Sequence, residues 1–363
     1  MSKSNATIEL KNISKEFKKT TIIEGMDLSI KAGEFLVLLG PSGCGKSTTL
    51  RMIAGLEEPS SGDVLIDNKN LKQVDDDGHT IAMVFQDYAL YPNMTVYQNL
   101  EYALKIHKVP KQERQKRIEN VLQTLNLVKY KDRLPSQLSG GQKQRVAVGR
   151  GMVKKSKIFL LDEPLSNIDV QLREKARDEI QNLHTMNHQT IVYVTHDQLE
   201  AMALGDRIAV MNQGIIQMID KPENIYNQPT NLFVAKFIGT PQINVIEVVI
   251  QKDHVTSNDS TVIQDSTLNL KEKTYYLGIR PENLQCSKVK KSELSQAVKI
   301  ENVIDYGRFV QLSLVMSDGQ TLKAIVNDFD FKVGDDIFVT FEKQTSILFD
   351  QETEKNLYWG NHE

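Results

Sequence analysis

The chain has 363 residues, so at roughly 150 residues per domain we expect two or three domains. Its content of 40% hydrophobic and 25% charged residues is ordinary for a globular protein and excludes a disordered chain, a collagen-like fibre and a coiled coil. The 44 Lys and Arg residues nearly balance the 47 Asp and Glu residues, giving a net charge of −3. No strong basic field exists, which argues against a dedicated nucleic-acid binder.

Nothing in the sequence has the length of a membrane-spanning or secretory segment. The longest unbroken apolar runs, residues 35–39 and 81–85, contain five residues each, whereas a membrane-spanning helix needs roughly 20. The N-terminus holds no apolar stretch of signal-peptide length. Two cysteines, Cys44 and Cys286, are too few for a disulfide framework. We therefore expect a soluble cytoplasmic protein.

The first two thirds of the chain alternate short apolar runs with longer helical patterns. Strands separated by helices of this length predict a parallel sheet with helices on its faces. In chain order we expect a strand at 34–39, a helix at 46–54, a strand at 81–85, helices at 96–106, 111–125 and 141–153, a strand at 157–162, a helix at 169–186, and strands at 190–195 and 207–211.

Beyond residue 237 the pattern changes to extended segments with little helix. Such segments, separated by polar or Gly-containing links, predict a small β-sandwich or barrel. We place the boundary at 237–242, where Gly239 and Pro241 interrupt the pattern, and expect a long loop at 257–273. The expected extended segments are 244–250, 274–279, 297–316, 321–326 and 335–342.

The predicted strand at 34–39 ends in a sequence that fits the phosphate-loop pattern G-x-x-x-x-G-K-[ST], and a predicted helix follows it. Glycines let backbone N–H groups face phosphate oxygens, and the helix N-terminus adds a favourable dipole. We expect Lys46 to reach the β- and γ-phosphates, Ser47 to ligate Mg²⁺ and Thr48 to add a phosphate contact. The predicted ATP-binding loop consists of Gly40, Pro41, Ser42, Gly43, Cys44, Gly45, Lys46, Ser47 and Thr48.

Two carboxylates, Asp162 and Glu163, end the apolar strand at 157–162. The last residues of a parallel strand lie at the carboxyl edge of the sheet, beside the phosphate loop. Asp162 suits a grip on Mg²⁺, directly or through water. Glu163 suits a general base or a positioner of the attacking water.

A third motif, Leu138-Ser139-Gly140-Gly141-Gln142, leads into the helix predicted at 141–153. Its glycines expose backbone N–H groups and Ser139 can cap the helix, which makes a second anion site. With this motif in place, residues 7–240 resemble the ATPases of ABC transporters. The resemblance implies an α/β P-loop domain at 1–237, with a helical subdomain at about 88–155.

The resemblance also assigns roles to residues whose pattern alone is uninformative. Gln86 matches the glutamine loop, and the resemblance implies that it acts in catalysis and on Mg²⁺. His196 matches the switch histidine, and Phe17 matches the aromatic residue that stacks on adenine. Residues 166–169 match the loop that follows the acidic pair.

In this family two nucleotide domains pair head to tail, so the resemblance implies a homodimer or a heterodimer with a related ATPase. The ATP held by one subunit would then contact the third motif of the other, through Ser139, Gly140, Gly141 and Gln142. It further implies two permease subunits, an indirect link to an extracytoplasmic solute-binding protein, and a peripheral location on the inner face of the cell membrane.

Several stretches are similar to ATPase subunits of carbohydrate importers of the maltose and multiple-sugar type. They include 84–100, 160–173, 193–202 and the late motif Gly-Ile-Arg-Pro-Glu-Asn at 278–283. Residues 238–363 would form an all-β, OB-like (TOBE-type) regulatory domain. An importer of polyamine, iron or sulfate is an alternative, and a soluble ABC ATPase acting on ribosomes or DNA is a more distant one. The single phosphate loop disfavours the ribosomal role, and the lack of a coiled coil between the phosphate loop and the third motif disfavours the DNA role.

Two local features stay open at this level. The aromatic segment 88–92 either offers a docking surface for a permease or packs within the helical subdomain. Gly151 stands where the family has alanine, although a glycine inside a helix costs about 1 kcal/mol relative to alanine. The sequence gives no reason for this glycine.

Overall fold

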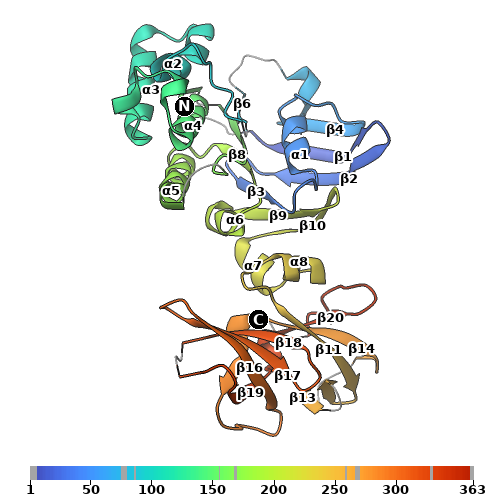
Figure 1. Cartoon of the computed structure of the whole chain (residues 1–363). Coiled ribbons are helices and arrows are strands. Elements are labelled where there is room, and N and C mark those ends of the chain that lie inside the picture. The colour runs from blue at the N-terminus through green and yellow to red at the C-terminus, as the bar shows by residue number, and fades with distance from the viewer. Residues whose placement is uncertain are drawn as a thin grey trace. The chain divides into compact units, whose positions relative to one another are not determined.

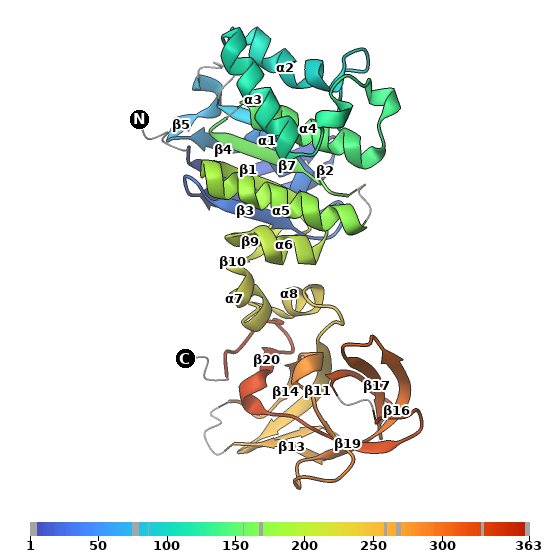
Figure 2. The ribbon, with the colours of Figure 1, turned by 90° about the vertical axis from the view of Figure 1, so that its left-hand side faces the viewer.

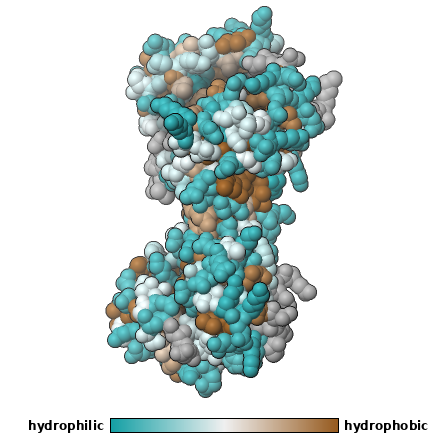
Figure 3. Space-filling model, turned by 90° about the vertical axis from the view of Figure 1, so that its right-hand side faces the viewer, coloured by the Kyte–Doolittle hydropathy of each residue, from teal (hydrophilic) through white to brown (hydrophobic). Residues whose placement is uncertain are grey.

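The computed structural model describes residues 6–74, 80–85, 87–154, 156–166, 170–257, 260–265, 270–327 and 330–359. The chain divides into two compact units, Met1–Pro222 and Glu223–Glu363, which Figure 1 colours from blue to yellow-green and from yellow to red. Hydrophilic side chains dominate the face drawn in Figure 3, and hydrophobic ones form small clusters there. Within the described ranges, no helix has the length and apolar character needed to cross a membrane.

A six-stranded sheet forms the centre of the first unit, in the order β10-β9-β3-β8-β7-β6. The strands from β9 to β6 are parallel, and β10 is antiparallel at the edge. Every residue of β3, β7 and β8 is buried, as expected when helices cover both faces of a parallel sheet. The strands are β3 (Phe35–Leu39), β6 (Ile81–Val84), β7 (Ile158–Asp162), β8 (Thr190–Thr195), β9 (Arg207–Asn212) and β10 (Ile215–Asp220).

The sequence patterns missed a second, antiparallel sheet in this unit. Its strands, in the order β2-β1-β4-β5, are β1 (Ile8–Phe17), β2 (Thr20–Ile30), β4 (Ser61–Ile66) and β5 (Lys69–Asn70). The register of β1 against β2 shifts between Leu10 and Ile13 and again at Lys15. Such bulges break the apolar–polar alternation by which a strand is recognised.

The expected helices are all present, each within one residue of its predicted bounds. Helix α1 packs between the two sheets, where Leu50 and Ile53 join one core with Ile8 and Leu36. Helices α5 and α6 lie across the face of the six-stranded sheet that Figure 2 turns toward the viewer. The expected helices are α1 (Lys46–Ile53), α2 (Val96–Ile106), α3 (Lys111–Thr124), α4 (Gly140–Lys154) and α5 (Val170–Asn187), and α6 (Gln198–Leu204) is a further helix that was not predicted.

Helices α2, α3 and α4 gather around their own core, beside the sheets in Figure 1. The aromatic segment at 88–92 belongs to this subdomain. The Tyr91 ring packs on Tyr102 of α2 with centroids 4.6 Å apart. The guanidinium of Arg150 on α4 lies 5.3 Å from the Tyr91 centroid and donates a 2.8 Å hydrogen bond to the Ala89 carbonyl. These contacts support the packing interpretation, although Tyr91 remains 39% exposed.

Helix α7 (Pro222–Asn227) starts at the last residue of the first unit, and α8 (Leu232–Phe237) lies within the second. The division after Pro222 therefore comes earlier than the predicted boundary at 237–242. Leu232 and Ala235 of α8 share a core cluster with Ile347 and Phe349 of β20, which explains the difference. A sequence pattern shows that a segment is helical, but only packing shows which domain it joins.

The rest of this unit is all β, as predicted, in two antiparallel five-stranded sheets. Their orders are β13-β12-β11-β14-β20 and β15-β19-β16-β17-β18. The extended segment predicted at 297–316 is a hairpin of two strands, and β13 lies inside the expected loop at 257–273. The strands are β11 (Asn244–Gln251), β12 (His254–Ser257), β13 (Ser260–Gln264), β14 (Thr274–Ile279), β15 (Gln285–Ser287), β16 (Gln296–Asp305), β17 (Val310–Met316), β18 (Thr321–Val326), β19 (Asp336–Thr340) and β20 (Ser346–Asp350).

Arg280, in the late motif 278–283, ties this β structure to α7 and α8. Its side chain is 3% exposed and donates to the carbonyls of Tyr226 (2.8 Å), Ala235 (3.1 Å) and Ile238. The guanidinium also lies 4.1 Å from the centroid of the Tyr226 ring. Burial, with Glu282 beside it, raises the pKa of Tyr226 to about 12, so its hydroxyl stays protonated and donates to Glu282 at neutral pH.

The structure gives a reason for Gly151 in α4. A Cβ atom at this position would lie 2.2 Å from Cε2 of Phe159, a ring that is 1% exposed in β7. The ring of Phe159 thus occupies the space that an alanine methyl group would need. Helix α4 can approach β7 at this point only because residue 151 has no side chain.

Gly151→Ala should therefore destabilise the protein by about 2 kcal/mol, because overpacking outweighs the gain of about 1 kcal/mol in helix propensity. Urea unfolding would measure this as a lower midpoint. Adding Phe159→Leu removes the clashing ring atoms, so the double variant should be more stable than Gly151→Ala alone. A rise in the midpoint for Gly151→Ala by itself would contradict the steric explanation.

Arg280→Ala should lower the stability of the second unit by about 2–4 kcal/mol, because it leaves buried carbonyl groups without donors. The matched control is Arg308→Ala in the same unit, since Arg308 is exposed and its loss should change the urea midpoint little. Equal midpoints for the two variants would show that the buried guanidinium adds no stability.

Candidate functional site

The phosphate-loop sequence forms a tight turn between β3 and α1. Gly43 and Gly45 take positive φ angles of 79° and 103°, which side-chain-bearing residues rarely adopt. A Cβ atom on Gly40 would lie 2.3 Å from the carbonyl oxygen of Met211. The glycines are therefore required by the backbone path, as the motif predicted. Cys44, also in this loop, is buried, and burial raises the pKa of its thiol.

The ammonium group of Lys46 is held inside the loop. Lys46 is 5% exposed, and its Nζ donates to the carbonyls of Gly40 at 2.8 Å and Pro41 at 2.9 Å. It is also the first residue of α1, directly after Gly45 at the N-cap. A cation and the free N–H groups of a helix N-terminus thus converge on one point, which makes a strong anion site.

Asp162, at the end of β7, lies against the first turn of α1. Its Oδ1 accepts a hydrogen bond of 2.7 Å from Ser47 Oγ, and the residue is 2% exposed. Burial raises the pKa of this carboxyl, and the Ser47 hydroxyl opposes the rise. The Ser47 hydroxyl and the Asp162 carboxylate therefore lie together at the start of α1.

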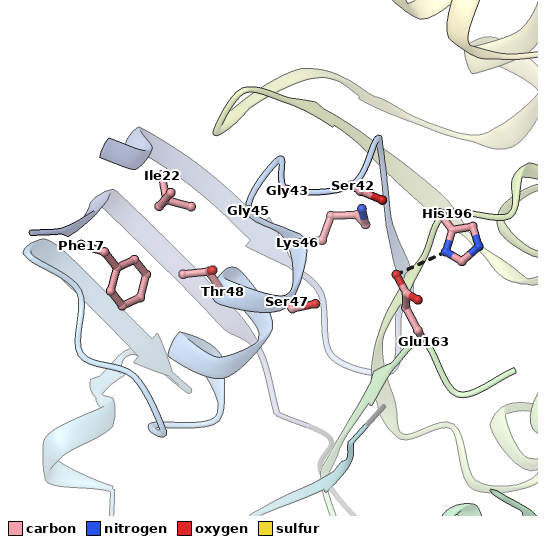
Figure 4. A pocket seen from close by; sticks show the side chains of 10 residues that line it. All are labelled: Phe17, Ile22, Ser42, Gly43, Gly45, Lys46, Ser47, Thr48, Glu163 and His196. Carbon is pink, nitrogen blue, oxygen red and sulfur yellow. Dashed lines mark ion pairs between the residues drawn. The ribbon is translucent and has the colours of Figure 1, made fainter. Parts of the chain in front are cut away.

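Glu163 and His196 face each other, as Figure 4 shows, with Oε1 and Nδ1 3.3 Å apart. Glu163 has a positive φ of 45°, and its backbone N–H donates to Val194 O of β8 at 3.0 Å. Ser166, the part of the loop at 166–169 that lies within the described residues, donates to the Glu163 carbonyl at 3.0 Å. The acidic pair and the histidine therefore come together at the ends of neighbouring strands.

These groups line one cavity of about 510 Å³, a volume typical of sites for small molecules and cofactors. Phe17 stands on its wall, 44% exposed, with the ammonium of Lys15 4.8 Å from the ring centroid. Ile22 of β2 also lines it, and no sequence signal marked that residue. The lining consists of Phe17, Ile22, Ser42, Gly43, Gly45, Lys46, Ser47, Thr48, Glu163 and His196 (Figure 4).

The third motif lies apart from this cavity: the described residues that line the cavity include none of Ser139, Gly140, Gly141 or Gln142. Ser139 Oγ accepts from the Gln142 N–H at 3.3 Å, and Gln142 Oε1 accepts from the Ser139 N–H at 3.0 Å. This reciprocal pair is a capping box, and the spacing S-x-x-Q would have predicted it. Ser139 caps α4 as expected. Gln86 and residues 167–169 lie outside the described residues.

Comparison with known proteins supports the class that the sequence motifs indicate, the ATPases of ABC transporters. A family model described as ABC transporter matches residues 23–166. The trehalose/maltose import ATP-binding protein MalK of Thermococcus litoralis is 41% identical, covering 97% of this chain and 100% of that protein. The sn-glycerol-3-phosphate import ATP-binding protein UgpC of Bordetella avium is 48% identical, covering 77% of this chain and 79% of that protein.

A solved structure gives the same result for the fold. The dimeric ATP-binding cassette MJ0796, bound to ADP and Pi in a post-hydrolysis state, is 34% identical with a TM-score of 0.55. The match covers 59% of this chain and 98% of that one. Together with the nucleotide-loop geometry and full-length relatives, these findings lead to one conclusion. This chain belongs to the family of ABC-transporter ATP-binding proteins, ATPases coupled to transport.

Proposed function

We propose that this chain is the ATP-hydrolysing subunit of a carbohydrate importer and works as a dimer on the cytoplasmic side of two permease subunits. The observation that carries the hydrolytic part is the 3.3 Å contact between Glu163 and His196. Both side chains line the cavity into which the phosphate loop and Ser47 open. A carboxylate held beside an imidazole at this point can take a proton from a water molecule next to a phosphate.

The phosphate loop would bind the nucleotide. Lys46, whose ammonium now contacts loop carbonyls, would exchange these for phosphate oxygens and gain charge-assisted hydrogen bonds. The N–H groups at the start of α1 and the Thr48 hydroxyl would add donors. The exposed ring of Phe17 would stack on the adenine base.

Mg²⁺ fits the oxygen pair formed by Ser47 and Asp162. This cation prefers oxygen ligands, and the protein usually supplies only one or two of them. Among the described residues no group of three or more His, Cys, Asp or Glu side chains is placed to hold a metal. Phosphate oxygens and water would complete the set, together with the amide oxygen of Gln86, to which the family resemblance assigns this role. When bound, the cation would neutralise charge on the β- and γ-phosphates.

Glu163 would act as the general base or position the attacking water, and His196 would hold its carboxylate toward the γ-phosphate. The positive φ of Glu163 supports this role, since residues held in sparsely populated backbone regions concentrate at functional sites. The hydrogen bonds from Glu163 N to Val194 O and from Ser166 Oγ to Glu163 O keep that backbone in place.

We further propose that the site is completed by a second subunit, a copy of this chain or a related ATPase. Ser139, Gly140 and Gly141 form the capped N-terminus of α4, an anion site that the cavity of the same chain does not use. The dimeric cassette MJ0796 is a precedent for pairing. ATP would then join the two subunits, and hydrolysis would release them.

The proposal of a carbohydrate rests on the relatives. One relative, matched over its full length, is a trehalose/maltose import ATP-binding protein, and another, matched over 79% of its length, is an sn-glycerol-3-phosphate import ATP-binding protein. An oligosaccharide or a sugar-phosphate-type solute is therefore the best-supported cargo. The chain would sit at the inner face of the cell membrane, with an extracytoplasmic solute-binding protein delivering the cargo to the permeases. Polyamine, iron or sulfate import is the competing proposal.

Glu163→Gln should reduce ATP turnover by at least about 100-fold, because the amide cannot accept the proton from water. ATP binding should persist, so the variant should elute from a sizing column as a dimer when ATP and Mg²⁺ are present. The matched control is Glu174→Gln, since Glu174 is an exposed acid on α5, and this variant should hydrolyse ATP normally.

Wild-type turnover by Glu163→Gln would exclude Glu163 as the catalytic group. The shared site has its own check, the specific activity of the wild-type chain as a function of protein concentration. A dimer-dependent site requires the specific activity to fall on dilution through the dimerisation range. A constant specific activity would mean that each chain hydrolyses ATP alone.

The cargo can be tested with the assembled transporter. The tagged chain, purified from detergent-solubilised membranes, should bring down two permease polypeptides, and the reconstituted complex with its binding protein should show ATPase activity stimulated by an oligosaccharide or a glycerol phosphate. Stimulation only by polyamine, ferric ion or sulfate would overturn the carbohydrate proposal. Recovery with ribosomes and without permeases would overturn the transport role.

A further inference from the structure

A buried carboxylate lies behind the site and is not among the described residues that line the cavity. Glu200, in the first turn of α6, is only 4% exposed. Its Oε2 accepts two hydrogen bonds, from Thr195 Oγ1 at 2.7 Å and from Tyr193 Oη at 2.9 Å. Both donors come from β8, the strand that leads to His196. Burying a carboxylate is unfavourable unless it is hydrogen-bonded, so these two bonds hold Glu200 against the strand end.

The Thr195 hydroxyl extends this link to both sides of His196. Besides donating to Glu200, Thr195 Oγ1 accepts a 3.0 Å hydrogen bond from the backbone N–H of Asp197. The residues directly before and after His196 are thereby joined through one oxygen. The turn that carries the imidazole is closed by this bond, and Glu200 fixes the rotamer of the hydroxyl that makes it.

Asp197 secures the other end of the same turn. Its Oδ1 caps α6 by accepting from the N–H groups of Leu199 at 2.8 Å and Glu200 at 3.2 Å. Its Oδ2 lies 3.4 Å from the guanidinium of Arg173 on α5. By contrast, the His196 side chain is itself 58% exposed and has Glu163 as the partner 3.3 Å away. The position of the ring therefore depends on the turn that carries it and on its contact with Glu163, because packing around it is sparse.

We propose that Glu200 is a positioning residue for His196: through the hydroxyl of Thr195 it holds the turn 195–197 so that the imidazole meets Glu163. This inference rests on the proposed role of His196 in hydrolysis. Among the described residues that line the cavity, Glu200 does not appear. Its effect on the reaction passes through the orientation of one side chain.

The geometry also shows that Glu200 must supply a hydrogen-bond acceptor. Both hydrogen bonds end on the single atom Oε2, so an amide oxygen in the same place can accept both. Glu200→Gln should therefore retain most activity, whereas Glu200→Ala removes the acceptor. Thr195→Val keeps the shape of the side chain and removes the hydroxyl that links Glu200 to Asp197.

A double-mutant cycle on ATP hydrolysis tests the proposal. Glu200→Ala should lower kcat about tenfold or more, as expected when a reacting group is misplaced, with the KM for ATP changed less than twofold. In a His196→Ala background, adding Glu200→Ala should lower kcat no further. Equal loss of kcat in both backgrounds, or a rise in KM with kcat unchanged, would overturn the positioning role.

Further variants distinguish the positioning role of Glu200 from a folding defect and from a failure of the proposed role of His196. Thr195→Val should lower kcat in the wild-type background but not in the His196→Ala background, and its thermal melt should be normal. This variant keeps the test valid if Glu200→Ala does not fold. The matched control is Thr190→Val, because Thr190 is equally buried at the far end of β8 and donates to Ala6 O at 2.6 Å. This control should leave kcat unchanged. If His196→Ala hydrolyses ATP at the wild-type rate, the proposed role of His196 fails, whatever Glu200 does.

Discussion

The parallel pairing of β3, β8 and β7 is the constraint on which the site depends. Because parallel strands end at the same edge of a sheet, three segments far apart in the chain meet there: the phosphate loop after β3, the acidic pair after β7 and His196 after β8. The hydrogen bond from Ser47 to Asp162 and the contact of Glu163 with His196 join these loops across the edge. No local feature of any one segment would bring these four side chains together.

The site carries charged groups that a protein interior disfavours. Lys46 and Asp162, and Glu200 behind the cavity, are each at most 5% exposed. Each has hydrogen-bond partners: carbonyls of the phosphate loop for Lys46, a hydroxyl of α1 for Asp162 and two hydroxyls of β8 for Glu200. Removing water strengthens the electrostatic interactions of such groups, and it also makes an unpaired one costly. The result is a cavity whose walls are held by polar bonds before any nucleotide enters. The capped N-terminus of α4, by contrast, lies outside the described lining of this cavity.

Outside the site, close contacts between backbone and side chain decide which residues are tolerated. Gly151 lets α4 approach the Phe159 ring, and Arg280 replaces water for three carbonyl groups of α7 and α8. In sequence, Gly151 looked like a weak point of a helix, and Arg280 was one residue of the late motif 278–283 that resembles carbohydrate-importer ATPases. Each proved to complement a particular neighbour, because packing density leaves no space for an added methyl group and a buried carbonyl requires a donor.

The sequence by itself determined the parallel strands, the five predicted helices, the phosphate loop and the acidic pair, because each has a local signal. A run of apolar residues marks a strand, a helical period marks a helix, a glycine motif marks the phosphate loop, and two carboxylates after an apolar run mark the acidic pair. The sequence did not reveal the bulged strands β1 and β2, the place of α7 and α8 in the second unit, Ile22 in the cavity wall, or the link from Glu200 to His196. Only the tertiary structure decided these, because a bulge erases the period-two pattern and contacts between distant residues leave no periodicity to detect.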